Sequence, residues 1–184
     1  MIVLKIIVCL LIADFLSGLF HWLVDAYSPK SNAFIKRHIT DPVILHHFRS
    51  REFTKNSWIK SAWVPMIAAF FVGLGFYFFV GFNWMVFLTL FIAINGQEVH
   101  KWSHRTKAEN GWLITLLQKI KIVQTRRHHA AHHKNPNNCT YCVITNYLNP
   151  ILDKIHFWEM LERVVYRLTG ISRFDYSVKP DMVR

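Results

Sequence analysis

Three apolar segments of membrane length constrain this chain of 184 residues more than any other feature. They cover residues 2–24, 62–80 and 84–99, and the second contains no charged side chain. A helix of about 20 apolar residues crosses the hydrocarbon core of a bilayer. Because unsatisfied backbone groups are costly in lipid, such segments fold as helices. We therefore predict an all-α integral membrane protein with about three transmembrane helices, forming one domain over residues 1–184.

The positive charges predict how these segments are oriented. The net charge is +11, and of the 22 Lys and Arg residues seven lie between residues 28 and 61 and fourteen follow residue 99. The positive-inside rule explains this asymmetry without nucleic acid as a partner. It places the N-terminus and the turn at residues 81–83 outside, with the other loops in the cytoplasm. We expect a multi-pass protein of a bacterial inner membrane or the endoplasmic reticulum, with its histidines on the cytoplasmic side.

The remaining sequence is compatible with shorter helices at the membrane surface. Residues 112–123 and 149–168 are apolar but basic, which is typical of interfacial helices. Pro150 is expected to open the second of these helices, and residues 135–138 to end a preceding helix that carries histidines. We therefore predict cytoplasmic or interfacial helices in addition to the transmembrane helices.

Closely spaced histidines predict a metal site. The sequence HHAAHH runs from His128 to His133, and His100 and His104 stand one helical turn apart. On a helix, His128/His132 and His129/His133 form two more such pairs, each on one face. His21 and Asp25 share this spacing. A closed zinc site needs four ligands, so the excess of imidazoles indicates two metals, and imidazole suits iron as well as zinc. The candidate ligands are His21, Asp25, His38, His46, His47, His100, His104, His128, His129, His132 and His133.

Other polar residues have alternative interpretations. Cys139 and Cys142 form a C-x-x-C that is compatible with a zinc site, although we consider this the weaker interpretation. His156 is expected to be a structural anchor at the membrane interface. Asp14 lies near the middle of a span, where a charged carboxylate is costly, so we expect it to be protonated or paired. Its neighbours Ser17 and Gly18 indicate a close helix contact.

Several longer blocks resemble the lipid desaturase family that contains Kua, CarF and plasmanylethanolamine desaturase. These blocks are SGLFHWLVD (17–25), HKWSH (100–104), RRHHAAHH (126–133), YCVITNYLN (141–149) and DKIHFWEMLE (153–162). The resemblance implies a membrane-embedded, oxygen-dependent di-iron desaturase that forms the vinyl ether bond of plasmalogens, with a plastid relative that acts on an acyl chain. The matching residues are His21, Asp25, His38, His100, His104, His128, His129, His132 and His133.

The central histidine block departs from the family pattern. The family usually has two adjacent histidines before Ile-Asp-Pro and one histidine downstream. This chain has His38 alone before Ile39-Thr40-Asp41-Pro42, followed by His46 and His47. The histidines of this block are therefore shifted along the sequence relative to the family pattern, and so are the ligands that the block is expected to contribute.

The expected chemistry is centred on the metal, so no side chain is assigned as a catalytic residue. Two iron ions with molecular oxygen as co-substrate would supply the oxidising power needed to desaturate an alkyl chain. The sequence contains neither a dinucleotide fingerprint nor a haem-attachment motif, so electrons must come from an external donor such as cytochrome b5 or a ferredoxin. The expected substrate is a membrane lipid, converted from its 1-O-alkyl to its vinyl ether form. The alternatives are an acyl desaturase or hydroxylase with the same metals, and a zinc-binding or metal-transporting membrane protein.

Overall fold

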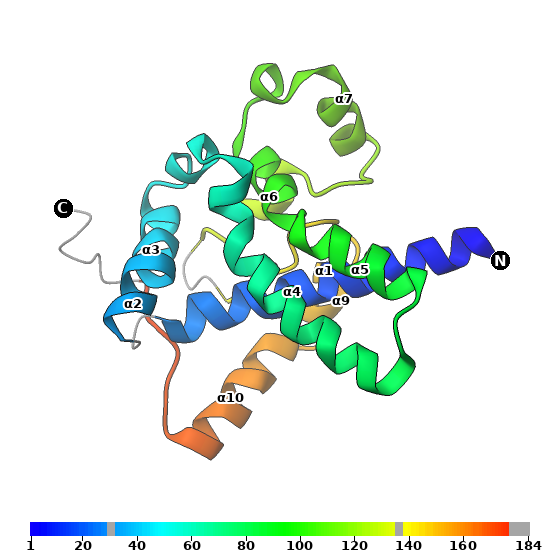
Figure 1. Cartoon of the computed structure of the whole chain (residues 1–184). Helices are drawn as coiled ribbons and strands as arrows, with labels where there is room; N and C mark the ends of the chain where they lie inside the picture. The colour runs from blue at the N-terminus through cyan, green and yellow to red at the C-terminus, as the bar shows by residue number, and fades with distance from the viewer. Residues whose placement is uncertain (29–31, 135–137, 177–184) are drawn as a thin grey trace.

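The computed structural model describes residues 1–28, 32–134 and 138–176, and every regular element in these ranges is a helix (Figure 1). Two helices are long and apolar enough to cross a membrane, α1 (Ile2–Tyr27) and α4 (Trp58–Val80). At 1.5 Å per residue they extend about 39 Å and about 34 Å, more than a hydrocarbon core of about 30 Å. The all-helical prediction is confirmed, and the first two predicted spans correspond to α1 and α4.

Local signals define the ends of α4. The Ser57 side chain accepts a hydrogen bond from the backbone N–H of Lys60, which caps the first turn. The helix ends at Gly81, whose φ of 66° lies in the left-handed region that glycine adopts without strain. The Asn83 side chain then accepts from the backbone N–H groups of Met85 and Val86 and starts α5 (Trp84–Ile94). The predicted tight turn at residues 81–83 is therefore confirmed.

The third predicted span, residues 84–99, is not one helix. α5 has 11 residues, about 16 Å, and α6 (Gly96–His104) begins after a break at Asn95. At this break the Asn95 side chain donates to the Phe91 carbonyl and accepts from the Trp58 indole N–H. α5 packs against both α1 and α4 (Figure 1). The apolar run therefore predicted a third long helix where the structure has a short helix and a separate, more polar helix.

A continuous series of short helices follows α1. α2 (Ala33–Ile35), the π-helical segment η2 (Lys36–Thr40) and α3 (Asp41–Phe48) succeed one another without a loop. The short helix η3 (Glu52–Lys55) then leads into α4. α3 and η2 both contact α1, which places their histidines beside its C-terminal half.

The remaining predicted helices are shorter than expected. α7 (Lys107–Lys119) is kinked at Gly111, where φ is 69°, and its second part covers residues 112–119 of the first predicted segment; none of its residues is buried. The histidine-bearing helix α8 (Arg126–His129) ends well before residues 135–137, which lie outside the described residues. Pro150 does open α9 (Asn149–Lys154), but His156, in a left-handed conformation with φ of 53°, separates it from α10 (Phe157–Thr169). The predicted helix over 149–168 is thus two helices.

A segment without regular structure, residues 138–148, is bound to the middle of α1. The Asp14 carboxylate accepts from the backbone N–H groups of Ile144 and Thr145 and from the Thr145 hydroxyl. A Cβ placed on Gly18 would lie 2.6 Å from Cys142 Sγ, so only glycine permits this approach. Asp14 is therefore paired as expected, and its partner is a loop rather than another helix.

Candidate metal centre

Side chains from four regions of the chain converge beside α1 in two adjoining groups. The histidine cluster consists of His46, His100, His104, His129 and His133. The aspartate cluster consists of His21, Asp25, His47 and His132. Within each cluster the potential ligand atoms lie within 4.8 Å of one another. α1, α3, α6 and the region of α8 with its following turn each contribute to these clusters.

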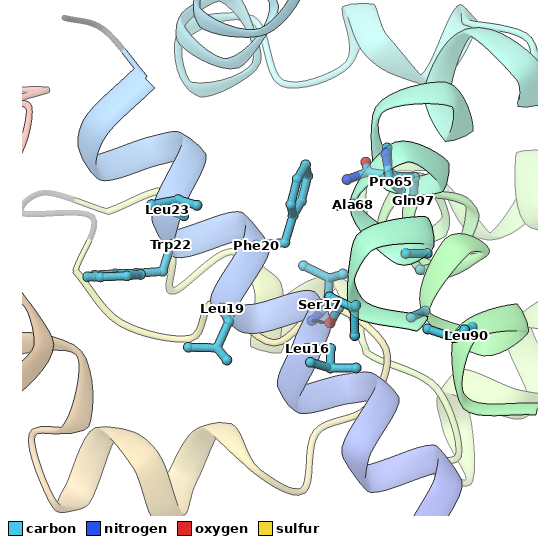
Figure 2. A pocket seen from close by; sticks show the side chains of 15 residues that line it. Leu16, Ser17, Leu19, Phe20, Trp22, Leu23, Pro65, Ala68, Leu90 and Gln97 are labelled. Carbon is cyan, nitrogen blue, oxygen red and sulfur yellow. Dashed lines mark hydrogen bonds between the residues drawn. The ribbon is translucent and has the colours of Figure 1, made fainter. Parts of the chain in front are cut away.

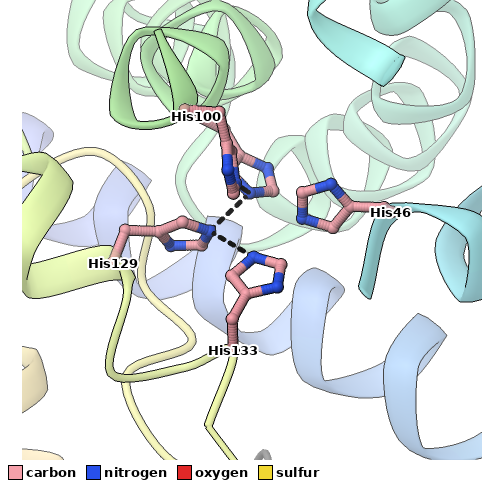
Figure 3. Close-up of side chains that lie close together, drawn as sticks. His46, His100, His129 and His133 are labelled. Carbon is pink, nitrogen blue, oxygen red and sulfur yellow. Dashed lines mark hydrogen bonds between the residues drawn. The ribbon is translucent and has the colours of Figure 1, made fainter. Parts of the chain in front are cut away.

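The nitrogens of the histidine cluster converge at distances suited to a shared ion (Figure 3). His129 Nε2 lies 2.9 Å from His100 Nε2 and 3.1 Å from His133 Nε2. Nitrogens bound to one ion at about 2.1 Å lie about 3 Å apart when their bonds are perpendicular. Both ring nitrogens of His46 are buried and have no hydrogen-bond partner among the described residues, although buried polar atoms are normally satisfied. These residues therefore fit a metal ion.

Burial keeps these imidazoles in the form that binds metal. The pKa values of His46, His100 and His129 lie well below the ordinary value of 6.5, because the charged ring loses hydration and is repelled by neighbouring rings. The same causes lower the pKa of His104 to about 3. A neutral imidazole has a lone pair available for coordination. The cluster is therefore ready to bind a cation at neutral pH.

The aspartate cluster gives an independent indication of a cation. His21 Nδ1 donates to the Tyr141 carbonyl over 3.0 Å, and His132 Nδ1 donates to the Cys139 carbonyl over 2.9 Å. Because a carbonyl only accepts, each of these Nδ1 atoms carries the proton and each Nε2 presents a lone pair in the neutral ring. These Nε2 atoms lie 3.4 Å and 3.0 Å from Asp25 Oδ2, itself an acceptor. A metal ion bound by these nitrogens and the carboxylate would satisfy all of them, so the donor set fits a metal ion.

His46 and His47 connect the two clusters. Consecutive residues of a helix point about 100° apart, and in α3 this directs His46 into the histidine cluster and His47 into the aspartate cluster. His47 Nε2 lies 2.9 Å from Asp25 Oδ2. The clusters also touch where the His21 and His100 rings lie 5.1 Å apart. The shifted histidine block therefore contributes one residue to each cluster.

Two of the predicted ligands lie outside both clusters. The ring of His38 packs against Phe34 and Trp63, with centroid distances of 4.6 Å and 5.8 Å. His128 Nε2 accepts a hydrogen bond from the Asn149 amide over 3.1 Å. The predicted His129/His133 pair is present, but the His128/His132 pair is not, because α8 ends at His129 and the following turn carries His132 toward Asp25.

Neither cysteine of the C-x-x-C belongs to either cluster. Cys142 is buried against Gly18, and Cys139 Sγ lies 3.9 Å from the Ala131 carbonyl. The cysteines therefore support the packing of the loop, and the described geometry does not favour a thiolate zinc site. His156 Nδ1 lies 2.7 Å from Glu159 Oε2 at the surface, and His156 belongs to neither cluster.

Tyr176 was not anticipated from the sequence. Its ring packs against that of His47 with a centroid distance of 4.1 Å and a tilt of 39°, and its hydroxyl donates to the Asp25 backbone carbonyl over 3.2 Å. Tyr176 is buried, so it covers the aspartate cluster on this side. No local spacing signals this role, because the residue lies far from the histidine blocks in the sequence.

Two cavities adjoin the clusters. The apolar cavity, of about 410 Å³, lies between α1, α4 and α5 and is lined by residues such as Leu16, Leu23, Ala68 and Leu90 (Figure 2). The histidine-lined cavity, of about 300 Å³, includes His21, Asp25, His46 and His100 in its wall. Phe20, Pro65 and Gln97 line both cavities, and Figure 2 shows Phe20 projecting from α1 toward the side on which Pro65 and Gln97 lie. The metal candidates therefore lie next to a space suited to an apolar chain.

Comparisons with known proteins agree with this site. The lipid desaturase domain matches residues 10–174. A probable fatty acid desaturase of Acanthamoeba polyphaga mimivirus is 33% identical over 91% of this chain and 84% of its own length. Plasmanylethanolamine desaturase 1 of Mus musculus is 28% identical over 92% of this chain and 67% of its length. Fatty acid desaturase 4, chloroplastic, of Arabidopsis thaliana is 31% identical over 91% of this chain and 52% of its length. No solved structure matches the chain significantly.

Proposed function

This chain belongs to the lipid desaturase family, and we propose that it is a membrane lipid desaturase whose two clusters each hold one iron ion. We further propose that it converts a 1-O-alkyl glycerophospholipid into its 1-O-alk-1′-enyl form, the vinyl ether of plasmalogens. The observation that carries this proposal is the pair of adjoining ligand clusters beside two neighbouring cavities. His21, Asp25, His46 and His100 line one cavity, which shares Phe20, Pro65 and Gln97 with the apolar cavity.

The proposed reaction removes two hydrogens from adjacent carbons of the alkyl chain. The substrate, molecular oxygen, two electrons and two protons yield the vinyl ether and two water molecules. Iron ions held by the two clusters would supply the oxidising power for this reaction together with molecular oxygen. The side chains place and tune the ions: Asp25 offsets their positive charge, and the carbonyls of Cys139 and Tyr141 fix the tautomers of His132 and His21.

The two cavities support a reaction close to the head of the lipid. The apolar cavity is lined by the middle of α1 and α4, whereas the histidine-lined cavity includes residues from η2 and the start of α4. A chain lying in the apolar cavity would pass Phe20 before its head-proximal carbons reached His21 and His100. The ether oxygen stabilises electron deficiency at the adjacent carbon, which favours hydrogen removal at that position.

The proposed topology places both clusters at the cytoplasmic side. The two long apolar helices and the family indicate a membrane protein. If α5 and α6 together return the chain toward the cytoplasm, the basic segments before α4 and after α6 lie on one side, as the positive-inside rule favours. An external carrier of the cytochrome b5 or ferredoxin type would then deliver electrons from the cytoplasm.

Expression in a host without plasmalogens tests this function. The cells are supplied with alkyl ether lipid, oxygen and a compatible reductase, and acid-labile vinyl ether lipid is measured by mass spectrometry. We expect product with the wild-type chain and none with His104→Ala or His132→Ala, which remove one ligand from each cluster. Purified wild-type protein should contain about two irons per chain if each cluster binds one ion. One zinc and no iron would contradict the di-iron proposal and favour the zinc-binding alternative.

Acyl-chain desaturation or hydroxylation is the second candidate. It is favoured by the names of two relatives, a probable fatty acid desaturase and fatty acid desaturase 4, which are 33% and 31% identical to this chain. The same lipid analysis distinguishes the candidates, because new double bonds or hydroxyl groups confined to acyl chains would replace the vinyl ether as the product.

A further inference from the structure

The histidine-lined cavity has two cationic side chains in its wall, Arg37 from η2 and Lys60 from the first turn of α4. The contact between the rings of His38 and Trp63, 5.8 Å apart and edge to face, holds these two elements together. Arg37 precedes His38, and Lys60 lies three residues before Trp63 on the same face of α4. The two cations therefore belong to one region of the cavity wall, and both are exposed.

Acidic residues near this region already have cationic partners. Among the described residues, neither Arg37 nor Lys60 forms an ion pair, and the neighbouring acids pair elsewhere. These pairs are Asp41 with Lys36 at 2.7 Å, Glu52 with Lys55 at 3.1 Å and Glu98 with Lys101 at 2.5 Å. Asp25 lies within the aspartate cluster. Arg37 and Lys60 are thus available to bind a negatively charged ligand.

Two further features of the same wall indicate a polar ligand. The Ser61 hydroxyl, next to Lys60, is a buried cavity-lining oxygen without a hydrogen-bond partner among the described residues. Arg37 lies in the π-helical segment η2, and single π-helical turns occur frequently at functional sites because they shift side chains out of the regular helical register. The cavity therefore offers two cations and an unsatisfied hydroxyl beside the metal candidates.

We propose that Arg37 and Lys60 bind the phosphate group of the lipid substrate. This proposal rests on the proposed function and identifies how the substrate is held. An Arg guanidinium binds phosphate oxygens in a bidentate manner, a Lys ammonium adds a point charge, and the Ser61 hydroxyl can donate a hydrogen bond. With the phosphate here and the chain end in the apolar cavity, the intervening carbons lie beside His21 and His100. Phosphate binding therefore sets which carbons face the clusters.

Binding to two matched probes tests this site. The full-length protein in detergent is titrated with 1-O-hexadecylglycero-3-phosphocholine and with 1-O-hexadecylglycerol, which lacks the phosphate, and bound lipid is measured by native mass spectrometry. We expect the wild-type protein to bind the phosphate-bearing probe about tenfold more tightly. Arg37→Ala with Lys60→Ala should remove this preference without changing affinity for hexadecylglycerol. Arg37→Lys should retain part of it, since the charge remains while bidentate geometry is lost.

Lys55→Ala is the matched control, because Lys55 is an exposed cation that does not line the cavity. A preference that survives the double substitution, or that Lys55→Ala removes equally, would overturn the proposal. Displacement of the phosphate-bearing probe by an equal concentration of inorganic phosphate would show a site for a free anion instead of a lipid. The same titration in His104→Ala measures binding in a variant that is not expected to turn over. If the wild type prefers the phosphate-bearing probe but desaturates no lipid, only the proposed function is refuted. If the wild type desaturates lipid and the double variant keeps the preference for the phosphate-bearing probe, only this inference is refuted.

Discussion

Replacing His46 and His47 separately by alanine is the most direct test of the two-cluster arrangement. The residues are adjacent in α3, and the side chains of both are buried. Both substitutions therefore change helix propensity and remove packing in a similar way, and each variant serves as the control for the other. His46 belongs to the histidine cluster, and His47 belongs to the aspartate cluster. If the clusters are separate metal sites, the two variants should each weaken the binding of a different ion.

The number of remaining ligands determines the size of each effect. Structural zinc sites with four ligands have apparent binding free energies of about 10–16 kcal/mol, which corresponds to about 3 kcal/mol, or about 100-fold in affinity, per ligand. His46→Ala leaves four imidazoles in its cluster, whereas His47→Ala leaves two imidazoles and Asp25. We therefore expect His47→Ala to reduce the metal content from about two ions to about one per chain. His46→Ala should keep two ions in metal-rich buffer but lose one to a chelator at lower concentration than the wild type does.

Metal content of the purified variants is measured by plasma mass spectrometry before and after dialysis against increasing concentrations of chelator. Circular dichroism verifies that both variants remain helical. Equal loss of both ions in both variants would show a single cooperative site, and a wild-type protein that binds one ion would refute the arrangement altogether.

Three further predictions concern packing, protonation and topology. Gly18→Ala places a Cβ 2.6 Å from Cys142 Sγ and should destabilise the protein by about 1–3 kcal/mol, measured as a lower Tm. Adding Cys142→Ala to the same chain should recover part of this stability, and a Tm that does not recover would contradict the close contact. Because burial lowers the pKa of His104 to about 3, the unfolded chain binds more protons than the folded chain between about pH 6.5 and pH 3. The stability of the fold and the retention of metal should therefore fall as the pH drops below about 6.5. Tm measured between pH 7.5 and pH 5.5 tests this, and a Tm that does not change with pH would argue against neutral buried imidazoles. A cysteine replacing Phe82 should react with an impermeant thiol reagent from outside while one replacing Lys107 should not, and the reverse pattern would overturn the proposed orientation.

The sequence identified most of the side chains that converge, but it was a weaker guide to which of them lie together. The HKWSH spacing correctly joined His100 and His104, because α6 is a regular helix through both residues. The HHAAHH block has the same spacing, yet only His129 and His133 meet, since the helix stops at His129. Periodicity assumes a continuous helix, and nothing within the block itself indicates where α8 ends.

The third predicted span shows a similar limit. Hydropathy integrates over a window, so the apolar residues of α5 concealed the break at Asn95. At that break the Asn95 side chain accepts a hydrogen bond from the Trp58 indole, a contact between residues distant in the sequence that a hydropathy window does not include. Likewise, His38 matches the family motif and was assigned to metal, but its aromatic neighbours Phe34 and Trp63 place it at the edge of the cavity.

Asp14 connects the membrane-length helix to the chemistry of the site. A carboxylate inside a span is costly unless it is satisfied, and the loop at residues 138–148 supplies two backbone N–H groups and the Thr145 hydroxyl. Those loop groups need acceptors for the same reason. Their mutual pairing fixes the loop on α1, and the same loop presents the Cys139 and Tyr141 carbonyls that set the tautomers of His132 and His21. Asp14 therefore contributes to the candidate metal centre without binding a metal itself, because it positions the backbone carbonyls that orient His21 and His132.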